Sequence, residues 1–218
     1  MSAGCHSHGH DHGAAAAASP AYRRILWVAL VVNLAMFVVE IGAGVAAQSA
    51  SLLADSLDFL GDAANYGISL FVLGMALHLR ARASLVKAAS MALFGLWVAY
   101  TTIAHALAGT VPEAPIMGVV GALAFAANLG VAFLLFRWRE GDSNMRSVWL
   151  CTRNDAIGNL AVLVAAAGVF GSGTGWPDYI VAAIMSGLAL WSAAQVTRHA
   201  FAELRHARTE APQAVGSL

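Results

Sequence analysis

Six apolar stretches in this chain are each long enough to cross a lipid bilayer as a helix, which takes about 20 residues. They cover approximately residues 25–47, 52–77, 85–108, 116–136, 148–170 and 179–196. Only 11% of the 218 residues are charged and the mean hydropathy is +0.69, whereas soluble domains carry about 25% charged residues. Because the stretches are continuous rather than alternating, they predict helices and not a barrel. We therefore expect an all-α membrane protein, built as a bundle of six transmembrane helices.

The basic residues predict how this bundle sits in the membrane. The loops after the first, third and fifth stretches contain no Lys or Arg, and eleven of the twelve basic residues fall on the opposite side. The exception is Arg153, inside the fifth stretch, which we expect to reach the headgroups or pair with Glu140 or Asp142; a gating role is the alternative. Since cytoplasmic loops are enriched in Lys and Arg, both termini are expected in the cytoplasm.

The composition divides the chain into three parts. Residues 1–20 form a His-rich cytoplasmic tail, residues 21–200 the transmembrane domain and residues 201–218 a short cytoplasmic tail. Disorder is expected over residues 1–20 and 207–218. The first tail alternates histidines with small residues, at His6, His8, His10 and His12. Such a run binds metals weakly and without fixed geometry, so it could collect cytoplasmic metal; the alternative is an incidental polar tail.

Three aspartates interrupt the second stretch. At about 100° per residue, they share one face of a helix with several other polar residues, and this face comprises Asp55, Asp58, Asp62, Asn65, Tyr66 and Ser69. A carboxylate in hydrocarbon costs several kcal/mol unless it takes up a proton or meets a cation. The pattern therefore indicates an ion pathway.

The fifth stretch carries a second pair of candidate ligands. Cys151 and Asp155 are spaced i,i+4, as are Asp58 and Asp62 in the second stretch. Two helices that each present two ligands one turn apart can close a tetrahedral site for a divalent metal of the zinc class. The alternative is a buried polar network between helices, but such networks are usually built from Ser, Thr, Asn or Gln. The sequence therefore predicts a metal site formed by these four residues.

Several neighbouring residues allow two interpretations. Cys151 could instead be a small buried hydrophobe, with Asn154 as a competing ligand in a slightly rotated register. Asp55 could line an exit path or cap the start of its helix. Glu40, which shares a face with Asn33, could be a proton site, could support the metal site, or could form a helix–helix hydrogen bond in its protonated form.

With these residues in view, the chain resembles the cation diffusion facilitator family over residues 24–200. The resemblance rests on NLAMFVVEIGAGVAAQSASLLADSLDFLGDAANY in the first two stretches and on CTRNDAIGNLAVLVAA in the fifth. It implies six helices, cytoplasmic termini, usually a homodimer, and export of divalent transition metals, usually zinc, in exchange for protons. Carried over by position, the resemblance implies the metal ligands Asp58, Asp62, Cys151 and Asp155.

The chain departs from the family pattern in three places. Cys151 occupies a position where the family often has His, and a thiolate would favour zinc or cadmium, whereas an unused cysteine would leave a harder site of three carboxylates. Only about twenty residues follow the last stretch, so we expect the usual cytoplasmic metal-binding domain to be absent and any homodimer to form through membrane helices. RWREGDSNMR replaces the usual His-rich loop.

We therefore expect a multi-pass transporter of a bacterial inner membrane that exports a divalent metal by proton-coupled antiport. Zinc is the first expectation for the cargo, followed by cadmium, cobalt and nickel. Its partners are metal cations, protons, the lipid bilayer and a second copy, with no nucleic acid.

Three other functions are alternatives to this hypothesis. A proton-coupled organic-cation exporter would need an aromatic cavity, for which the second stretch offers Phe59, Tyr66 and Phe71. A membrane metal sensor would need an output domain, and none is visible. A metal-dependent hydrolase would need an HExxH motif, which the sequence lacks, so no enzyme is expected.

Overall fold

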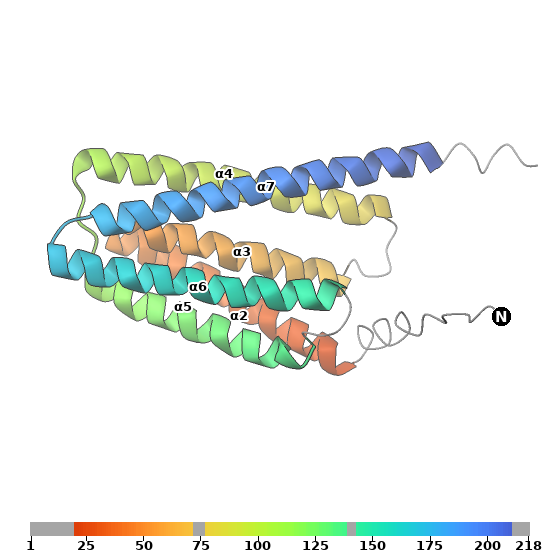
Figure 1. Cartoon of the computed structure of the whole chain (residues 1–218), viewed down its shortest axis with the longest axis horizontal. Helices are drawn as coiled ribbons and strands as arrows, with labels where there is room; N and C mark the ends of the chain where they lie inside the picture. Colours follow the sequence, from red (N-terminus) through yellow and green to blue (C-terminus); the bar gives the residue numbers. More distant parts are fainter. Residues whose placement is uncertain (1–19, 72–76, 139–142, 211–218) are drawn as a thin grey trace, which may run out of the picture.

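The described part of the chain is a bundle of long helices. The computed structural model describes residues 20–71, 77–138 and 143–210 (Figure 1). The helices are α2 (Pro20–Ala47), α3 (Ala50–Phe71), α4 (Leu77–Ala108), α5 (Ala114–Leu135), α6 (Ser143–Ser172) and α7 (Trp176–Glu210), with the short 3-10 helix η1 (Phe136–Trp138). The described residues contain no strand. The prediction of an all-α membrane bundle is confirmed.

Two of the helices, α4 and α7, extend well beyond the apolar stretches expected for them. α4 begins at Leu77 rather than at residue 85, and α7 continues to Glu210, beyond the expected end at residue 196. Backbone hydrogen bonds continue along a helix after its side chains become polar, so hydropathy marks only the part in contact with lipid. Residues 207–210 therefore belong to α7, which corrects the expected disorder over that range.

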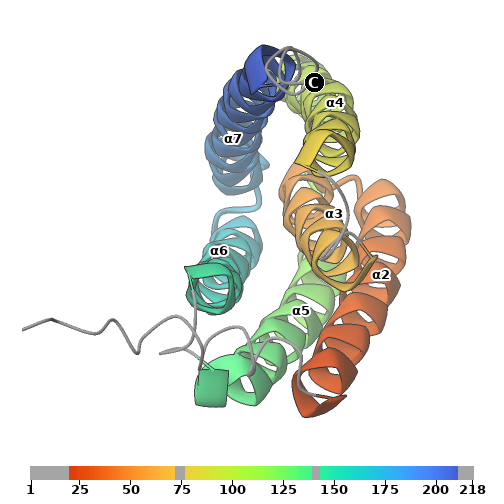
Figure 2. The ribbon, with the colours of Figure 1, turned by 90° about the vertical axis from the view of Figure 1, so that its right-hand side faces the viewer.

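Five of the described helices are long and apolar enough to cross a membrane, and α3 is the exception. Its three aspartates are spaced so that any stretch of spanning length includes all of them. The other helices shield it: α3 packs against α2, α4, α6 and α7. Seen end-on, α3 lies between α2 and α4, with α6 and α7 across from it (Figure 2). The helix that carries the three aspartates is thus packed against four others.

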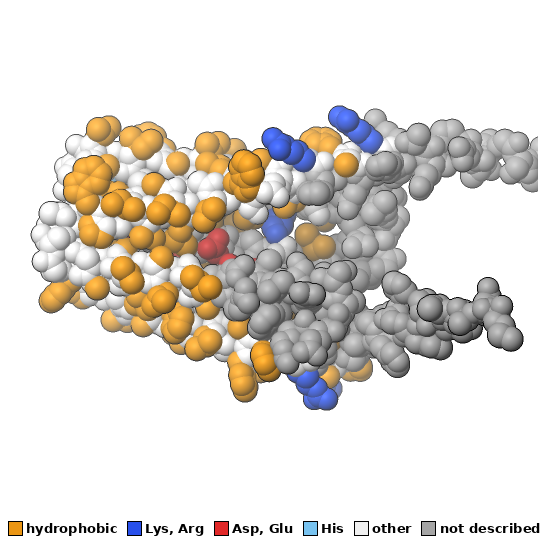
Figure 3. Space-filling view, in the orientation of Figure 1, with side chains coloured by type: hydrophobic (Ala, Val, Ile, Leu, Met, Phe, Trp, Pro, Cys, Tyr) orange, Lys and Arg blue, Asp and Glu red, His pale blue; other side chains and the backbone are white. Residues whose placement is uncertain are grey.

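The distribution of side chains is the reverse of that in a soluble protein. Large apolar side chains are exposed along the helices, including Leu107 at 85% and Phe133 at 80%, and they cover much of the surface in Figure 3. Polar side chains are buried instead, among them Glu40 and Asp55, each with no exposed surface. An apolar exterior around a polar interior fits a bundle surrounded by lipid.

Both ends of the described chain lie at the same end of the bundle, which we name the terminal end (Figure 1). The described Lys and Arg side chains in Figure 3 gather toward that end, and the opposite part of that face shows none. This distribution matches the one expected for a cytoplasmic terminal end. The opposite end, which carries the connections around residues 48–49, 109–113 and 173–175, is named the loop end.

Asp178 joins α7 to the start of α3 at the loop end. Its carboxylate accepts hydrogen bonds from Ser49 Oγ at 2.7 Å, from the Ala50 amide at 2.8 Å and from the Ser51 amide at 3.0 Å. Ser49 also caps α3 locally, because its Oγ accepts a hydrogen bond from the Leu52 amide at 3.2 Å. Asp178 lies in the first turn of α7, so one carboxylate stabilises the positive ends of two helix dipoles.

Two further contacts tie the loop end together. The Glu113 amide donates to the Ala47 carbonyl at 3.0 Å, which links the start of α5 to the end of α2. The Tyr179 hydroxyl donates to the Thr110 carbonyl, which links α7 to the connection between α4 and α5. A side chain at Gly175 would collide with both of those groups, so this position requires glycine. The loop end is therefore held by polar contacts between segments far apart in the sequence.

We predict that Asp178→Ala lowers the free energy of unfolding by about 1–3 kcal/mol, because it leaves buried amides without their acceptor. Thermal unfolding in detergent measures the effect. The matched control is Glu113→Ala, because Glu113 occupies the N-cap position of α5 but makes no side-chain cap hydrogen bond. Equal unfolding midpoints for the two variants would contradict the assigned role of Asp178.

Candidate functional site

The interface between α3 and α6 contains the acidic residues of the second stretch. Asp62 Oδ2 accepts a hydrogen bond from the Tyr66 hydroxyl at 2.8 Å and lies 3.4 Å from Thr152 Oγ1 on α6. The hydroxyls of Tyr66 and Thr152 are themselves 2.6 Å apart. The carboxyl group of Asp155 on α6 is near enough to interact with Asp62. Asp62 is thus held in place by its own helix and linked directly to α6.

Asp58 lies on the same side of α3, toward the loop end. Its Oδ2 lies 3.6 Å from the position that a Cβ at Gly158 of α6 would occupy. Its charge interacts with those of Asp55 and Asp62. Asp58 and Asp155 are only partly buried, and an acidic side chain is visible between α7 and α6 in Figure 3. The interface is therefore acidic and accessible in part.

The structure describes the side chains of three of the four predicted ligands. It places Asp58, Asp62 and Asp155 along one interface, whereas the side chains of Cys151 and Asn154 lie outside the described residues. Among the side chains that are described, no three of His, Cys, Asp and Glu already form a cluster that could hold a metal ion. The four-ligand site therefore stays a prediction.

The two glycines next to the predicted ligands have different neighbours. A Cβ at Gly158 would make ordinary contacts, at 3.5 Å from Met185 Cε and 3.6 Å from Asp58 Oδ2. A Cβ at Gly61 would instead meet Met91 Cε on α4 at 3.2 Å. Gly61 therefore allows the approach of α3 to α4, whereas Gly158 faces Asp58 of α3.

A chain of buried polar groups lies next to the acidic residues, toward the loop end. Asn128 Nδ2 on α5 donates to Asn159 Oδ1 on α6 at 2.9 Å, and Asn159 Nδ2 donates to Asp55 Oδ2 at 2.7 Å. Asp55 is therefore a buried hydrogen-bond acceptor between helices. The alternative that it caps its helix is wrong, because α3 begins at Ala50 and Ser49 and Asp178 supply the cap.

Glu40 of α2 faces the other side of Asp55. It has no exposed surface, and its charge interacts with that of Asp55. Within the described residues, neither Glu40 oxygen has a hydrogen-bond partner, and Asp55 Oδ1 has none either. Two buried carboxylates that interact in this way repel each other, which favours a proton on one of them. Asn33, predicted to share this face, instead donates to the Ala29 carbonyl of its own helix at 2.8 Å.

Sequence reasoning missed the role of two residues at this site. Thr152 joins Asp62 and Tyr66 through its hydroxyl, and Lys87 of α4 donates a hydrogen bond to Asn65 Oδ1 of α3. Lys87 falls inside the apolar stretch that begins at residue 85, rather than in the loop before it. Its position in the sequence could have indicated its role, since a lysine inside a membrane span needs a partner.

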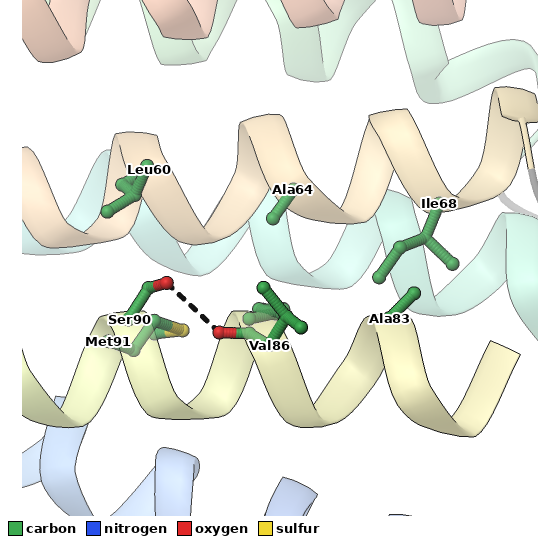
Figure 4. Close-up of a pocket in the computed structure, with 8 residues that line it drawn as sticks. Leu60, Ala64, Ile68, Ala83, Val86, Ser90 and Met91 are labelled. Carbon is green, nitrogen blue, oxygen red and sulfur yellow. Dashed lines mark hydrogen bonds between the residues drawn. The ribbon is translucent and has the colours of Figure 1, made fainter. Parts of the chain in front are cut away.

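A groove between α3 and α4 flanks Lys87. Figure 4 shows side chains of α3 facing side chains of α4 across it, and its lining consists of Leu60, Ala64, Ile68, Ala83, Val86, Lys87, Ser90 and Met91. Ser90 donates to the carbonyl of Val86 at 3.0 Å and so turns its hydroxyl to its own helix. The lining is therefore mainly apolar, with the Lys87 side chain as its charged member.

Comparison with known protein families gives one match that covers most of the chain. The model of the cation efflux transmembrane domain matches residues 26–205. This range includes all six long helices in whole or in part, together with the acidic interface between α3 and α6. Members of this family carry divalent metal cations across membranes. The chain therefore belongs to the cation efflux, or cation diffusion facilitator, family of metal transporters.

Proposed function

We propose that this protein exports a divalent transition metal, zinc first, in exchange for protons. The observation that carries the proposal is the placement of Asp62 and Asp58 of α3 against α6, inside a bundle with an apolar exterior: Asp62 lies 3.4 Å from Thr152 Oγ1, and Asp58 lies beside Gly158. Carboxylates gathered at such a place fit a divalent cation, which would offset their charge. Asp58 extends the same acidic interface.

The proposed ligands are Asp58, Asp62, Cys151 and Asp155. Cys151 precedes Asp155 by one helical turn on α6, so the two residues share a face of that helix. Closing the site requires a small movement of α3 and α6 toward each other around the metal. The hydroxyls of Tyr66 and Thr152 would then orient the Asp62 carboxylate from outside the ligand shell.

The ligand set favours zinc. Three carboxylates and one thiolate in tetrahedral arrangement suit zinc or cadmium, with cobalt and nickel as further candidates. If Cys151 does not bind, the remaining oxygen ligands would suit a harder ion. Exchange of Cys151 for Ser therefore decides whether sulfur sets the selectivity.

Proton exchange follows from the chemistry of the ligands. Carboxyl groups that lie near one another titrate as a group, so at least one of the aspartates would hold a proton when no metal is bound. A metal binds the deprotonated form of its ligands, so its arrival releases that proton. When the site opens to the other side, protons that enter it would displace the metal, which yields antiport by alternating access.

The pair formed by Glu40 and Asp55 is a second candidate carrier of a proton. It lies beside the metal ligands, on the side toward the loop end, and Asn159 fixes Asp55 from α6. We propose that a proton on this pair is exchanged during transport, while the pair itself does not bind the metal. The sequence left three roles open for Glu40, and that of a proton site agrees best with its interaction with Asp55.

The described conformation favours access to the site from the terminal end. The layer of Asp55, Asn159 and Asn128 is buried toward the loop end, and the contacts of Asp178 close that end further. Asp58 and Asp155 are partly exposed. With a cytoplasmic terminal end, this would be the state that loads metal from the cytoplasm.

The organic-cation alternative has weaker support. Phe59 and Tyr66 are buried in the packed interior, and the Tyr66 hydroxyl is engaged by Asp62 and Thr152. The side chain of Phe71 lies outside the described residues. The homodimer, the bacterial inner-membrane location and the collection of metal by the histidine tail stay predictions, and residues 1–19 of that tail lie outside the described residues.

We predict that Asp155→Asn and Asp62→Asn each weaken zinc binding by at least about tenfold, because each removes one charged ligand. Equilibrium dialysis of zinc against the detergent-purified full chain measures this. The control is Ser56→Ala, on the same helix as Asp62, whose hydroxyl bonds only to the Leu53 carbonyl. All proteins carry the same histidine tail, so a difference between them reports the membrane site. Wild-type affinity in both aspartate variants would exclude the proposed ligands.

A pair of substitutions at Gly158 tests the geometry of the site. Gly158→Ala should keep zinc binding, because its Cβ would lie 3.6 Å from Asp58 Oδ2, an ordinary contact. Gly158→Leu should lose most of it, since the longer side chain would extend into the space of the Asp58 carboxylate. The same dialysis measures both, with thermal unfolding to show that each variant folds. Equal binding by the two variants would place the metal elsewhere.

We predict that Glu40→Gln separates metal binding from proton coupling. Zinc affinity at fixed pH should stay within about threefold of wild type, while zinc flux into proteoliposomes should respond less to an imposed pH gradient, because the proton of this pair is no longer exchanged and only those of the metal ligands remain. Asn33→Ala is the control on the same helix, since Asn33 bonds within α2. A wild-type response to the gradient would show that Glu40 does not carry the coupled proton.

A further inference from the structure

Lys87 occupies an unusual place for a positive charge. It lies in α4, inside the segment of residues 82–108 that is long and apolar enough to cross the membrane. Of the Lys and Arg side chains that the structure describes, it is the one that is not exposed. A lysine at such a place costs free energy unless an opposite charge or a polar partner compensates it. The groups that interact with Lys87 should therefore indicate its function.

Two of its partners lie on the acidic helix α3. The Lys87 ammonium donates a hydrogen bond to Asn65 Oδ1, and its charge acts on the Asp62 carboxylate. Asn65 follows Asp62 by three residues, which is about 4.5 Å along a helix, in the direction of the terminal end. The ammonium thus stands at the flank of the acidic interface from which metal would arrive.

The methylene groups of Lys87 lie in an apolar environment, and its ammonium reaches a polar one. The Lys87 side chain lines the α3–α4 groove together with Leu60, Ala64 and Val86 (Figure 4). An apolar wall accommodates the four-carbon stem, and the ammonium reaches past it to the polar face of α3. The position is therefore fixed from two sides, by the groove and by Asn65.

We propose that Lys87 is a built-in counter-cation of the metal site, which lowers the affinity for divalent metal and so promotes its release. The inference rests on the proposed function of that site. A fixed positive charge offsets part of the negative charge of the aspartates when the site is empty, and it repels an arriving ion in proportion to the charge of that ion. A site of three carboxylates without this cation would hold a divalent metal more tightly and release it more slowly.

A purely structural role predicts a different result. If Lys87 served only to hold α4 against α3 through Asn65, a neutral donor at this position would preserve its function. Lys87→Gln provides such a donor and removes only the charge. Asn65→Ala does the reverse, because it removes the acceptor and keeps the charge.

The experiment measures zinc affinity and zinc transport for the full chain. Equilibrium dialysis in detergent gives the dissociation constant, and flux into proteoliposomes gives KM and kcat. For Lys87→Gln we expect zinc to bind at least about tenfold more tightly, with KM and kcat both reduced. Lys87→Arg should restore values within about threefold of wild type, because it keeps the charge. Arg82→Met is the matched control, since it removes an exposed cation from the same helix, and should change neither constant.

The results distinguish a failure of the counter-cation from a failure of the proposed metal site. Unchanged or weaker zinc binding in Lys87→Gln, while Asp155→Asn still loses binding, would overturn the counter-cation and leave the metal site intact. Equal binding by wild type and Asp155→Asn would instead remove the proposed site. Lys87→Met serves as a second neutral variant, and thermal unfolding shows which proteins are folded. Tighter binding in either folded neutral variant, together with lower kcat, supports the counter-cation.

Discussion

A carboxyl group held away from water in a membrane costs several kcal/mol unless a proton, a hydrogen bond or a cation compensates it. Four such groups, Glu40, Asp55, Asp58 and Asp62, lie on two adjacent helices of this bundle, and Asp155 faces them from a third. This cost accounts for the position of α3 in the bundle, where it packs against α2, α4, α6 and α7. It also accounts for the polar partners around the carboxyl groups, because each contact replaces part of the lost hydration.

The two ends of the bundle are built differently, and the difference suits a transporter. At the loop end, Asp178 and the amides of α3 form a closed set of hydrogen bonds, and the buried asparagines form a second layer beneath it. On the terminal side of the acidic interface the polar contacts are the hydroxyls of Tyr66 and Thr152 and the ammonium of Lys87. Opening the loop end requires these carboxylate–amide bonds to break or to move as a unit with α3 and α7. Metal and proton occupancy of the acidic interface would set the balance between the two states.

Much of the fold could be predicted from the sequence, because the length of an apolar stretch directly reflects the thickness of a membrane. The helix ends could not, since helical hydrogen bonds continue into polar segments such as the last turns of α7. The face that carries Asp58 and Asp62 follows from helical periodicity, but the partner of Asp55 does not: Asn159 lies 104 residues away, and only tertiary packing brings the two together. Asp178 as the cap of α3 and Lys87 beside Asn65 were missed for the same reason.

The most direct test of the account is a simultaneous record of zinc and pH inside proteoliposomes that contain the wild-type protein. With an imposed pH gradient across the membrane, we predict that zinc accumulates in the more acidic lumen and that the lumen becomes less acidic as zinc enters. Reversing the gradient should reverse the direction of zinc movement. Zinc entry with no accompanying proton movement, or at a rate independent of the gradient, would contradict proton-coupled export by this bundle.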